Sequence, residues 1–303
     1  IGHIDAIIRE AVSMGADPIR AIRMGTLNAA AYFGLHDMGA VAPGYKADLA
    51  VFDDLRTLNV KQVYKGGKLV AENGKMLHQK EKNTDWSTEI KERVFHSFHR
   101  VPITVEELQL KETTGTHQRV IDMVAHELIT KERIEEWKEL PGVAPGVDIS
   151  RDIVKLAAIE RHKNTGHVGL GFLGKYGLKK GAVATSIGHD SHNLVIAGVT
   201  DEDMVLAGNR VIENGGGLAI ALEGKVLADL PLPIGGLMAD EPVEVVDEKL
   251  EHMKKLSVEL GISEDIDAFM TLAFISLPVI PKLRLNTYGV VDVEKHQVVE
   301  ARF

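Results

Sequence analysis

The stretch Val183-Ala-Thr-Ser-Ile-Gly-His-Asp-Ser-His-Asn-Leu-Val-Ile-Ala-Gly-Val199 places two apolar runs on either side of a polar centre. Short apolar runs bounded by turn residues are typical of buried strands, so the sequence predicts two strands joined by a loop. The loop, residues 188–193, carries two imidazoles, a carboxylate, a hydroxyl and an amide. Such groups transfer protons and gather at functional sites. The alternative is a loop whose side chains only satisfy their own turn backbone.

Strand and helix patterns alternate around this loop. Apolar runs predict strands at 153–160, 169–172, 218–222 and 226–230, with two more beyond Pro281. Amphipathic spacing predicts helices at 202–213, 243–260 and 263–275. Residues 151–303 are therefore interpreted as one α/β or α+β domain.

The first 77 residues have a different pattern. Helical spacing predicts a helix over 4–12, and Asp17-Pro18 is typical of the start of a second helix that ends near Gly34. Residues 38–77 predict a small β module with a buried strand at 47–52 and a hairpin at 61–71. Residues 78–150 are interpreted as a linker and the start of the C-terminal region. There we expect strands at 101–110 and 119–124 and a charged turn at 131–137.

Three glycines, Gly169, Gly171 and Gly174, match the G-x-G-x-x-G pattern of dinucleotide-binding proteins. That function requires a strand before the glycines and a helix after them. Here the glycines alternate with apolar residues, as they would inside a strand, so close backbone packing is the favoured interpretation.

Further polar residues precede this glycine-rich strand. Arg161, His162 and His167 would converge with the 188–193 loop if this glycine-rich strand were a neighbour of the strand at His189. His96 and His99 would share one face if this segment were a helix, but they lack the third and fourth ligands that a metal site requires.

Composition excludes several classes of function. The net charge of −9 over 303 residues argues against nucleic acid or an anionic membrane as the main partner, since phosphate binding needs a basic surface. No apolar run is long enough to span a membrane. The absence of cysteine excludes disulfides and thiolate metal sites and is compatible with the cytoplasm. The chain starts without Met in what resembles a helix, so we expect it to be part of a longer protein.

Three blocks of sequence resemble one family. Residues 186–238, SIGHDSHNLVIAGVTDEDMVLAGNRVIENGGGLAIALEGKVLADLPLPIGGLM, closely resemble the C-terminal domain of the bacterial adenine deaminases, in the amidohydrolase superfamily. Residues 276–293, SLPVIPKLRLNTYGVVDV, resemble the same family. Residues 17–54, DPIRAIRMGTLNAAAYFGLHDMGAVAPGYKADLAVFDD, resemble the end of an amidohydrolase barrel and its return into a small β-sandwich.

The resemblance implies a domain organisation. Residues 1–37 would be the final helices of a (β/α)8 TIM barrel, residues 38–77 a small β-sandwich module, and residues 151–303 the adenine deaminase C-terminal domain. Without the rest of the barrel, the helices over 4–34 would expose apolar faces.

The resemblance also implies a reaction. Adenine would be converted to hypoxanthine and ammonia, in purine salvage, by water activated at a binuclear manganese or iron site. The family's ligands include a His-x-His pair, and this chain contains none. We therefore assign no metal ligand here and expect the ligands in a barrel segment upstream or in a second chain. We also expect a homo-oligomer.

The resemblance also suggests roles for the side chains of the 188–193 loop. His189, Asp190 and His192 are candidate catalytic residues at the border of the site, and Ser191 and Asn193 are candidates for substrate binding. An alternative function is a non-catalytic accessory module that supplies dimer contacts and a lid. An unrelated ligand-binding α/β protein is a third hypothesis, and no phosphate or cofactor cradle supports it.

Overall fold

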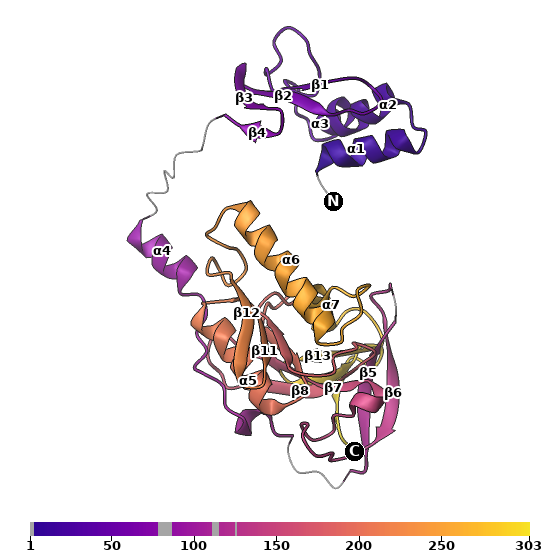
Figure 1. The fold of residues 1–303 in the computed structure, drawn as a ribbon, viewed down its shortest axis with the longest axis vertical. Helices are drawn as coiled ribbons and strands as arrows, with labels where there is room; N and C mark the ends of the chain where they lie inside the picture. Colours follow the sequence, from indigo (N-terminus) through magenta and orange to yellow (C-terminus); the bar gives the residue numbers. More distant parts are fainter. Residues whose placement is uncertain (1–2, 78–86, 111–114, 125) are drawn as a thin grey trace. The chain divides into compact units, whose positions relative to one another are not determined.

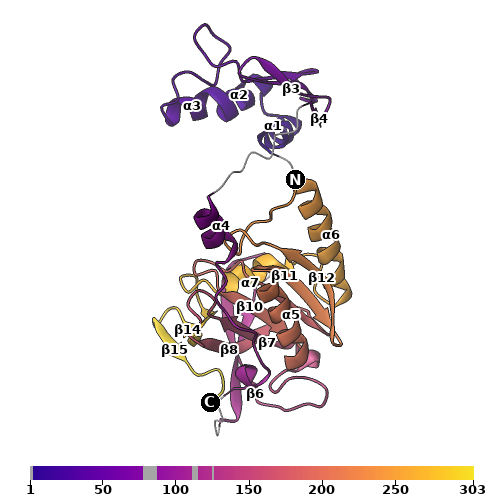
Figure 2. The same ribbon diagram turned by 90° about the vertical axis from the view of Figure 1, so that its left-hand side faces the viewer.

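The computed structural model describes residues 3–77, 87–110, 115–124 and 126–303. The chain divides into two compact units, Ile1–Asp85 and Trp86–Phe303, as Figures 1 and 2 show. The expected linker begins at His78, and its first nine residues lie outside the described ranges. Within those ranges, no helix is both long and apolar enough to cross a membrane.

The N-terminal unit combines short helices with a small antiparallel sheet. Its helical elements are α1 (Ile4–Ser13), α2 (Pro18–Arg23), the π-helical segment η1 (Met24–Asn28) and α3 (Ala29–Tyr32). Its strands, in sheet order, are β1 (Leu49–Phe52), β2 (Val60–Lys65), β3 (Lys68–Glu72) and β4 (Lys75–Met76). The predicted helix start is confirmed, because the Asp17 carboxylate accepts the backbone N–H of Arg20 at 2.8 Å.

Few residues of this unit are buried. Its buried hydrophobic side chains are Ala21, Ala30 and Leu58. No residue of α1 is buried, and large apolar side chains on the helices are exposed, among them Ile7 at 60% and Phe33 at 73%. The expected buried strand at 47–52 forms, but the two middle residues of β1 are exposed, so the expectation of its burial was wrong. The helices therefore carry an apolar surface that this unit does not itself cover.

The C-terminal unit is built on an eight-stranded mixed sheet with the order β12-β11-β9-β10-β7-β8-β5-β6. All neighbouring strands are antiparallel except β5 and β8. The strands are β5 (His117–Met123), β6 (Thr130–Glu136), β7 (Ile153–Ile159), β8 (Val168–Gly174), β9 (Ala182–Thr185), β10 (Leu194–Gly198), β11 (Gly217–Leu222) and β12 (Lys225–Pro231). The mixed α/β class expected for this region is confirmed.

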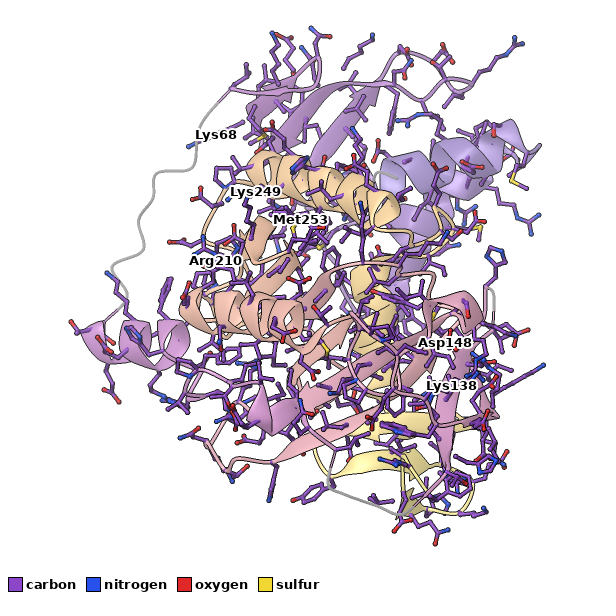
Figure 3. All side chains as sticks on the ribbon, turned by 60° about the horizontal axis from the view of Figure 1, so that its bottom comes forward. Lys68, Lys138, Asp148, Arg210, Lys249 and Met253 are labelled. Carbon is purple, nitrogen blue, oxygen red and sulfur yellow. The ribbon has the colours of Figure 1, made fainter. Side chains whose placement is uncertain are left out.

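Helices cover both faces of this sheet (Figure 1). On one face, Ala157 and Ile159 of β7 pack in the same cluster as Met204 and Val211 of α5 (Asp201–Glu213). On the other, Leu156 and its alternate neighbours pack with α6 (Val243–Glu259) and α7 (Ala268–Ile275). Met253 of α6, labelled in Figure 3, is fully buried there. The two-residue period of β7 thus supplies both cores.

A second, three-stranded sheet lies against the α6 and α7 face. It consists of β13 (Leu283–Asn286), β14 (Gly289–Asp292) and β15 (Gln297–Val299). A Cβ atom added at Gly169 would lie 1.9 Å from the backbone oxygen of Asn286, and one at Gly171 would lie 3.0 Å from Val290. The strand interpretation of these glycines is confirmed, since both lie in β8 and permit close backbone approach.

The segment expected to be a charged turn at 131–137 is instead largely the edge strand β6, so that prediction was wrong. Charge suggested a turn, but the charged side chains pair across to β5, Arg119 with Glu132 and Arg133 with Asp122. An edge strand accepts such residues because its outer side faces water. In the loop that follows β6, the Gly146 N–H donates a hydrogen bond to the Lys138 oxygen. Lys138 and Asp148, near this loop, are labelled in Figure 3.

The strand expected at 101–110 is also absent, because this segment forms only a 3-10 turn, η2 (Glu106–Leu108). The backbone groups of Ile103 form hydrogen bonds with the side chain of Asn209 and not with a neighbouring strand. The Ile103 N–H donates to Asn209 Oδ1 at 2.8 Å, and Asn209 Nδ2 donates to the Ile103 oxygen at 3.0 Å. Ile103 and Leu108 are still buried against the α5 face. Upstream, α4 (Thr88–Phe95) is a short helix.

The glycines of β8 generate the first prediction. Gly169→Ala should lower the free energy of unfolding by about 2–3 kcal/mol, because the new Cβ would meet backbone that cannot move aside. Gly171→Ala is the matched control and should cost about 1 kcal/mol or less, because its Cβ would meet only side-chain ends. Urea unfolding measures both. Equal losses would show that the approach of β13 and β14 does not depend on Gly169.

Candidate functional site

The polar loop 188–193 joins β9 to β10, two strands whose residues are all buried. The predicted strand–loop–strand arrangement is therefore confirmed. β10 pairs with β7 in the register Leu194↔Ile159. The loop consequently lies beside the residues that follow β7, at the same end of the central strands.

Arg161 and His162, directly after β7, contact the loop backbone. Arg161 Nε donates to the His192 oxygen, and its Nη2 donates to the Gly235 oxygen at 3.1 Å. His162 Nε2 lies 2.6 Å from the Ser191 oxygen. The condition stated for this convergence is not met, because β8, the glycine-rich strand that follows these residues, pairs with β7 and β5 and not with β9 or β10. Arg161 and His162 reach the loop through β7 instead, which they follow and which pairs with β10. His167 does not join them, and its ring packs against Tyr288 with centroids 4.8 Å apart.

The end of α7 holds the other side of the loop. The His189 N–H donates to the Ala273 oxygen at 2.9 Å, and Ser276 Oγ lies 3.2 Å from the His189 oxygen. The His189 ring also packs on Phe274, with centroids 4.8 Å apart. The backbone of the loop is thus held by residues that follow β7 on one side and by the end of α7 on the other.

The five candidate side chains are held differently. The His189 and His192 rings are neighbours with centroids 5.9 Å apart, and both are partly buried. Asp190 and Ser191 are exposed at the tip of the loop. Asn193 Nδ2 donates to Ser191 Oγ at 3.1 Å. The loop therefore presents two imidazoles behind an exposed carboxylate and hydroxyl.

Three buried polar atoms in this cluster have no hydrogen-bond partner among the described residues: Arg161 Nη1, His192 Nδ1 and Asn193 Oδ1. Buried polar groups in folded proteins are nearly always paired, and an unpaired one costs about 1–3 kcal/mol. The cluster thus has unused donor and acceptor capacity for a ligand, water or another segment.

The protonation states of His192 and Arg161 differ at neutral pH. Burial lowers the pKa of His192, and the neighbouring His189, Arg161 and His162 lower it further, against a smaller opposing effect of Asp190. His192 is therefore neutral at neutral pH, so it can accept a proton or a hydrogen bond. Burial also lowers the pKa of Arg161 to about 10, which leaves it charged.

Glu160 shapes the turn that carries Arg161 and His162. Its carboxylate accepts the backbone N–H groups of His162, Lys163 and Thr165 at 2.6, 2.9 and 2.9 Å. Partial burial disfavours the charged form, but these bonds outweigh it and lower the pKa of Glu160 to about 2.

Some residues of the cluster carried no sequence signal of their own. Phe274 and Ser276 contact the loop from 85 or more positions away in the chain, which no local pattern predicts. Gly236 backs the Arg161 guanidinium, where an added Cβ would lie 2.5 Å from Nη1. The adjacent glycines Gly235 and Gly236 are a local feature from which close packing could have been predicted here.

The described residues hold no group of three or more His, Asp or Glu side chains arranged to bind a metal ion. His189, Asp190 and His192 thus do not fit a metal site by themselves. What the loop can do chemically is accept and donate hydrogen bonds and move a proton at His192.

Comparisons with known proteins match nearly the whole chain. Residues 127–297 match the model of the adenine deaminase C-terminal domain, and residues 2–70 match that of the amidohydrolase family.

Similar proteins include "Adenine deaminase 2" of Carboxydothermus hydrogenoformans, 44% identical over 99% of this chain and 51% of that protein. "Adenine deaminase" of Petrotoga mobilis is 43% identical over 97% of this chain and 50% of its own length. "Adenine deaminase" of Kosmotoga olearia is 44% identical over 98% of this chain and 50% of its own length. The chain spans about half the length of these relatives.

The Glu160 turn generates the second prediction. A carboxylate whose pKa is lower when folded adds stability above its unfolded value near 4.5, and that stability is lost as pH falls toward 2. Glu160→Gln should therefore cost about 1 kcal/mol at neutral pH, and the gap from wild type should close through this window. Chemical unfolding across pH tests it. Glu264→Gln, at an exposed carboxylate, is the control. A gap that stays constant from neutral to acid pH would contradict the charge-based role.

Proposed function

The chain belongs to the adenine deaminase family, and on that premise we propose that it is the C-terminal part of an enzyme that converts adenine and water to hypoxanthine and ammonia. The observation that carries the proposal is the identity of 43–44% to three adenine deaminases over almost all of this chain. In the proposal, the chain acts with a barrel segment, in the same or another polypeptide, that matches the other half of those relatives.

The N-terminal unit supports this arrangement. The amidohydrolase match covers residues 2–70, and the exposed apolar side chains of α1, α2 and α3 would be covered by packing on barrel strands. We propose that residues 1–37 are the last barrel helices, residues 38–77 the small sandwich module, and residues 78–150 the link to the 151–303 domain. The homo-oligomeric state, a cytoplasmic location and a role in purine metabolism belong to the same proposal.

The metal chemistry is proposed to lie outside this chain. A binuclear manganese or iron site would supply an activated water, and the described residues provide no ligand group for it. The ligands would therefore come from the barrel segment.

The loop 188–193 is proposed to border the adenine site. Neutral His192 has a buried Nδ1 without a partner, and Asn193 has a buried Oδ1 in the same condition among the described residues. These atoms would hydrogen-bond the purine edge or a neighbouring active-site loop. Asp190 and His189 would assist proton movement, and Ser191 would contact the substrate from the exposed tip.

A non-catalytic accessory role is the second candidate. The observation that favours it is the anchoring of the loop backbone by Arg161, His162 and the end of α7, which suits a fixed lid or dimer contact. In this case the loop would shape the site without contributing proton transfer.

The third prediction tests whether metal binding and adenine deamination require the barrel segment. The 303-residue chain alone should neither deaminate adenine nor retain a transition metal after dialysis, whereas the protein with the barrel segment should do both. Elemental analysis and ammonia release measure this. One or two tightly held ions per 303-residue chain would contradict the placement of the ligands upstream.

The fourth prediction tests the loop. In the complete protein, His192→Ala should lower adenine turnover about a hundredfold, equivalent to about 2.7 kcal/mol of transition-state stabilisation, and His189→Ala should lower it less. The melting temperature should stay near that of the wild type. His252→Ala, at an exposed position on α6, is the control. Normal turnover in both loop variants, or a loss explained by unfolding, would remove the loop from the site.

A further inference from the structure

A small pocket of about 200 Å³ lies between α7 and the β5–β6 hairpin, and Phe274, whose ring packs on His189, is one of its lining residues. Its walls are mainly apolar and aromatic. The lining includes Met123, Leu128, Met270, Phe274, Ile275 and Arg284. No step of the proposed deaminase function uses this pocket.

Arg284 is the unusual residue in this pocket. Its side chain is 1% exposed, and it lies on β13 among apolar neighbours. The guanidinium donates to the backbone oxygens of Leu128 and Leu283, while Nε is buried without a partner among the described residues. Five N–H donors therefore face two acceptors, and neither acceptor carries a charge.

The cation also lacks a counter-ion in the described part of the chain. No ion pair joins Arg284 to any described carboxylate, and burial alone lowers its pKa, to about 10. The group is still charged at neutral pH. An isolated buried charge costs several kcal/mol, and proteins offset that cost with a charged or strongly hydrogen-bonding partner. The pocket lining contains one acidic residue, Glu127, whose side chain is exposed and makes no ion pair with Arg284.

The walls define the rest of the ligand. Leu128 is 52% and Met270 44% exposed, so apolar side chains form much of the accessible part of the lining, while Arg284 is buried. A phosphate or sulfate would need many polar donors around it, and these walls do not offer them. The volume, below the usual 300 Å³ for drug-sized ligands, limits the guest to a small molecule.

We propose that this pocket binds a small organic acid, with its carboxylate on the Arg284 guanidinium and its apolar body against Met270 and Phe274. A carboxylate matches the fork of a guanidinium and would accept the N–H groups that the backbone leaves free. The inference rests on the pocket alone and does not depend on the proposed deaminase activity.

The test uses sodium benzoate as the probe and calorimetric titration of the 303-residue chain. We expect saturable binding in the millimolar range, as suits about nine ligand atoms. Benzamide, the neutral analogue, should bind at least tenfold more weakly. Failure of benzoate to saturate at tens of millimolar, or equal affinity for benzamide, would overturn the proposal. Inorganic phosphate that saturates in competition with benzoate would also overturn it, because the site would then read charge alone.

Two variants locate the binding. Arg284→Met should abolish benzoate binding, and the melting temperature reports whether the chain still folds. Met270→Trp leaves Arg284 in place and fills the opening, so it should weaken binding at least tenfold even if the first variant is unstable. Met76→Trp, at an exposed methionine of the N-terminal unit, is the matched control and should bind like the wild type. Unchanged affinity in Met270→Trp would place the ligand elsewhere and refute the assignment.

Discussion

The antiparallel pairing of β7 with β10 determines how the C-terminal unit distributes its side chains. Its register opposes Ile159 to Leu194, so the chain leaving β7 meets the chain entering β10. Because side chains alternate along β7, one strand supplies both the α5 face and the α6–α7 face. The same pairing brings Arg161 and His162 to the polar loop. Core and candidate site thus follow from one register, and a one-residue slip would exchange the two faces and displace the site.

The buried cations of the C-terminal unit differ in their hydrogen-bond partners. Lys155, on β7, is 1% exposed and is paired at 2.7 Å with Asp201 at the start of α5, where Gln109 also donates to the carboxylate. This cation is satisfied within the fold. Arg161 and Arg284 are equally buried, yet the acceptors of both are backbone oxygens. The cations without a matching carboxylate are therefore Arg161, beside the polar loop, and Arg284, in the lining of the pocket.

The local sequence pattern predicted the buried strands of the C-terminal unit, but not the elements whose form depends on distant residues. The apolar runs of β10 and β11 are buried strands that nothing polar interrupts, and in β7 the one charged residue, Lys155, is buried with Asp201 as its partner. β6 was missed because its charges suit an edge, and the sequence does not reveal which strand lies at the edge. The segment at Ile103 was missed because its hydrogen-bond partner, Asn209, lies 106 positions away.

The candidate site shows the same division. The density of polar groups in residues 188–193 marked the loop, while its neighbours depended on strand order. The contacts of Arg161 and His162 were expected only on the condition that the glycine-rich strand adjoins the strand at His189. The structure makes them through the pairing of β7 with β10, which no local pattern predicts. Phe274 and Ser276 gave no signal at all. The roles of the loop side chains depend on what surrounds the loop in the complete protein, which lies beyond the reach of local pattern.

The charged character of β6 has a consequence for how the protein behaves in a crowded solution. A terminal strand offers unpaired backbone groups to any other chain that could extend the sheet, and such growth leads to fibrils. On β6, Lys131, Glu132 and Arg133 follow one another, and a passing strand would have to strip water from them before it could pair. The charged residues that led to the wrong prediction of a turn therefore also disfavour aggregation through this edge of the sheet.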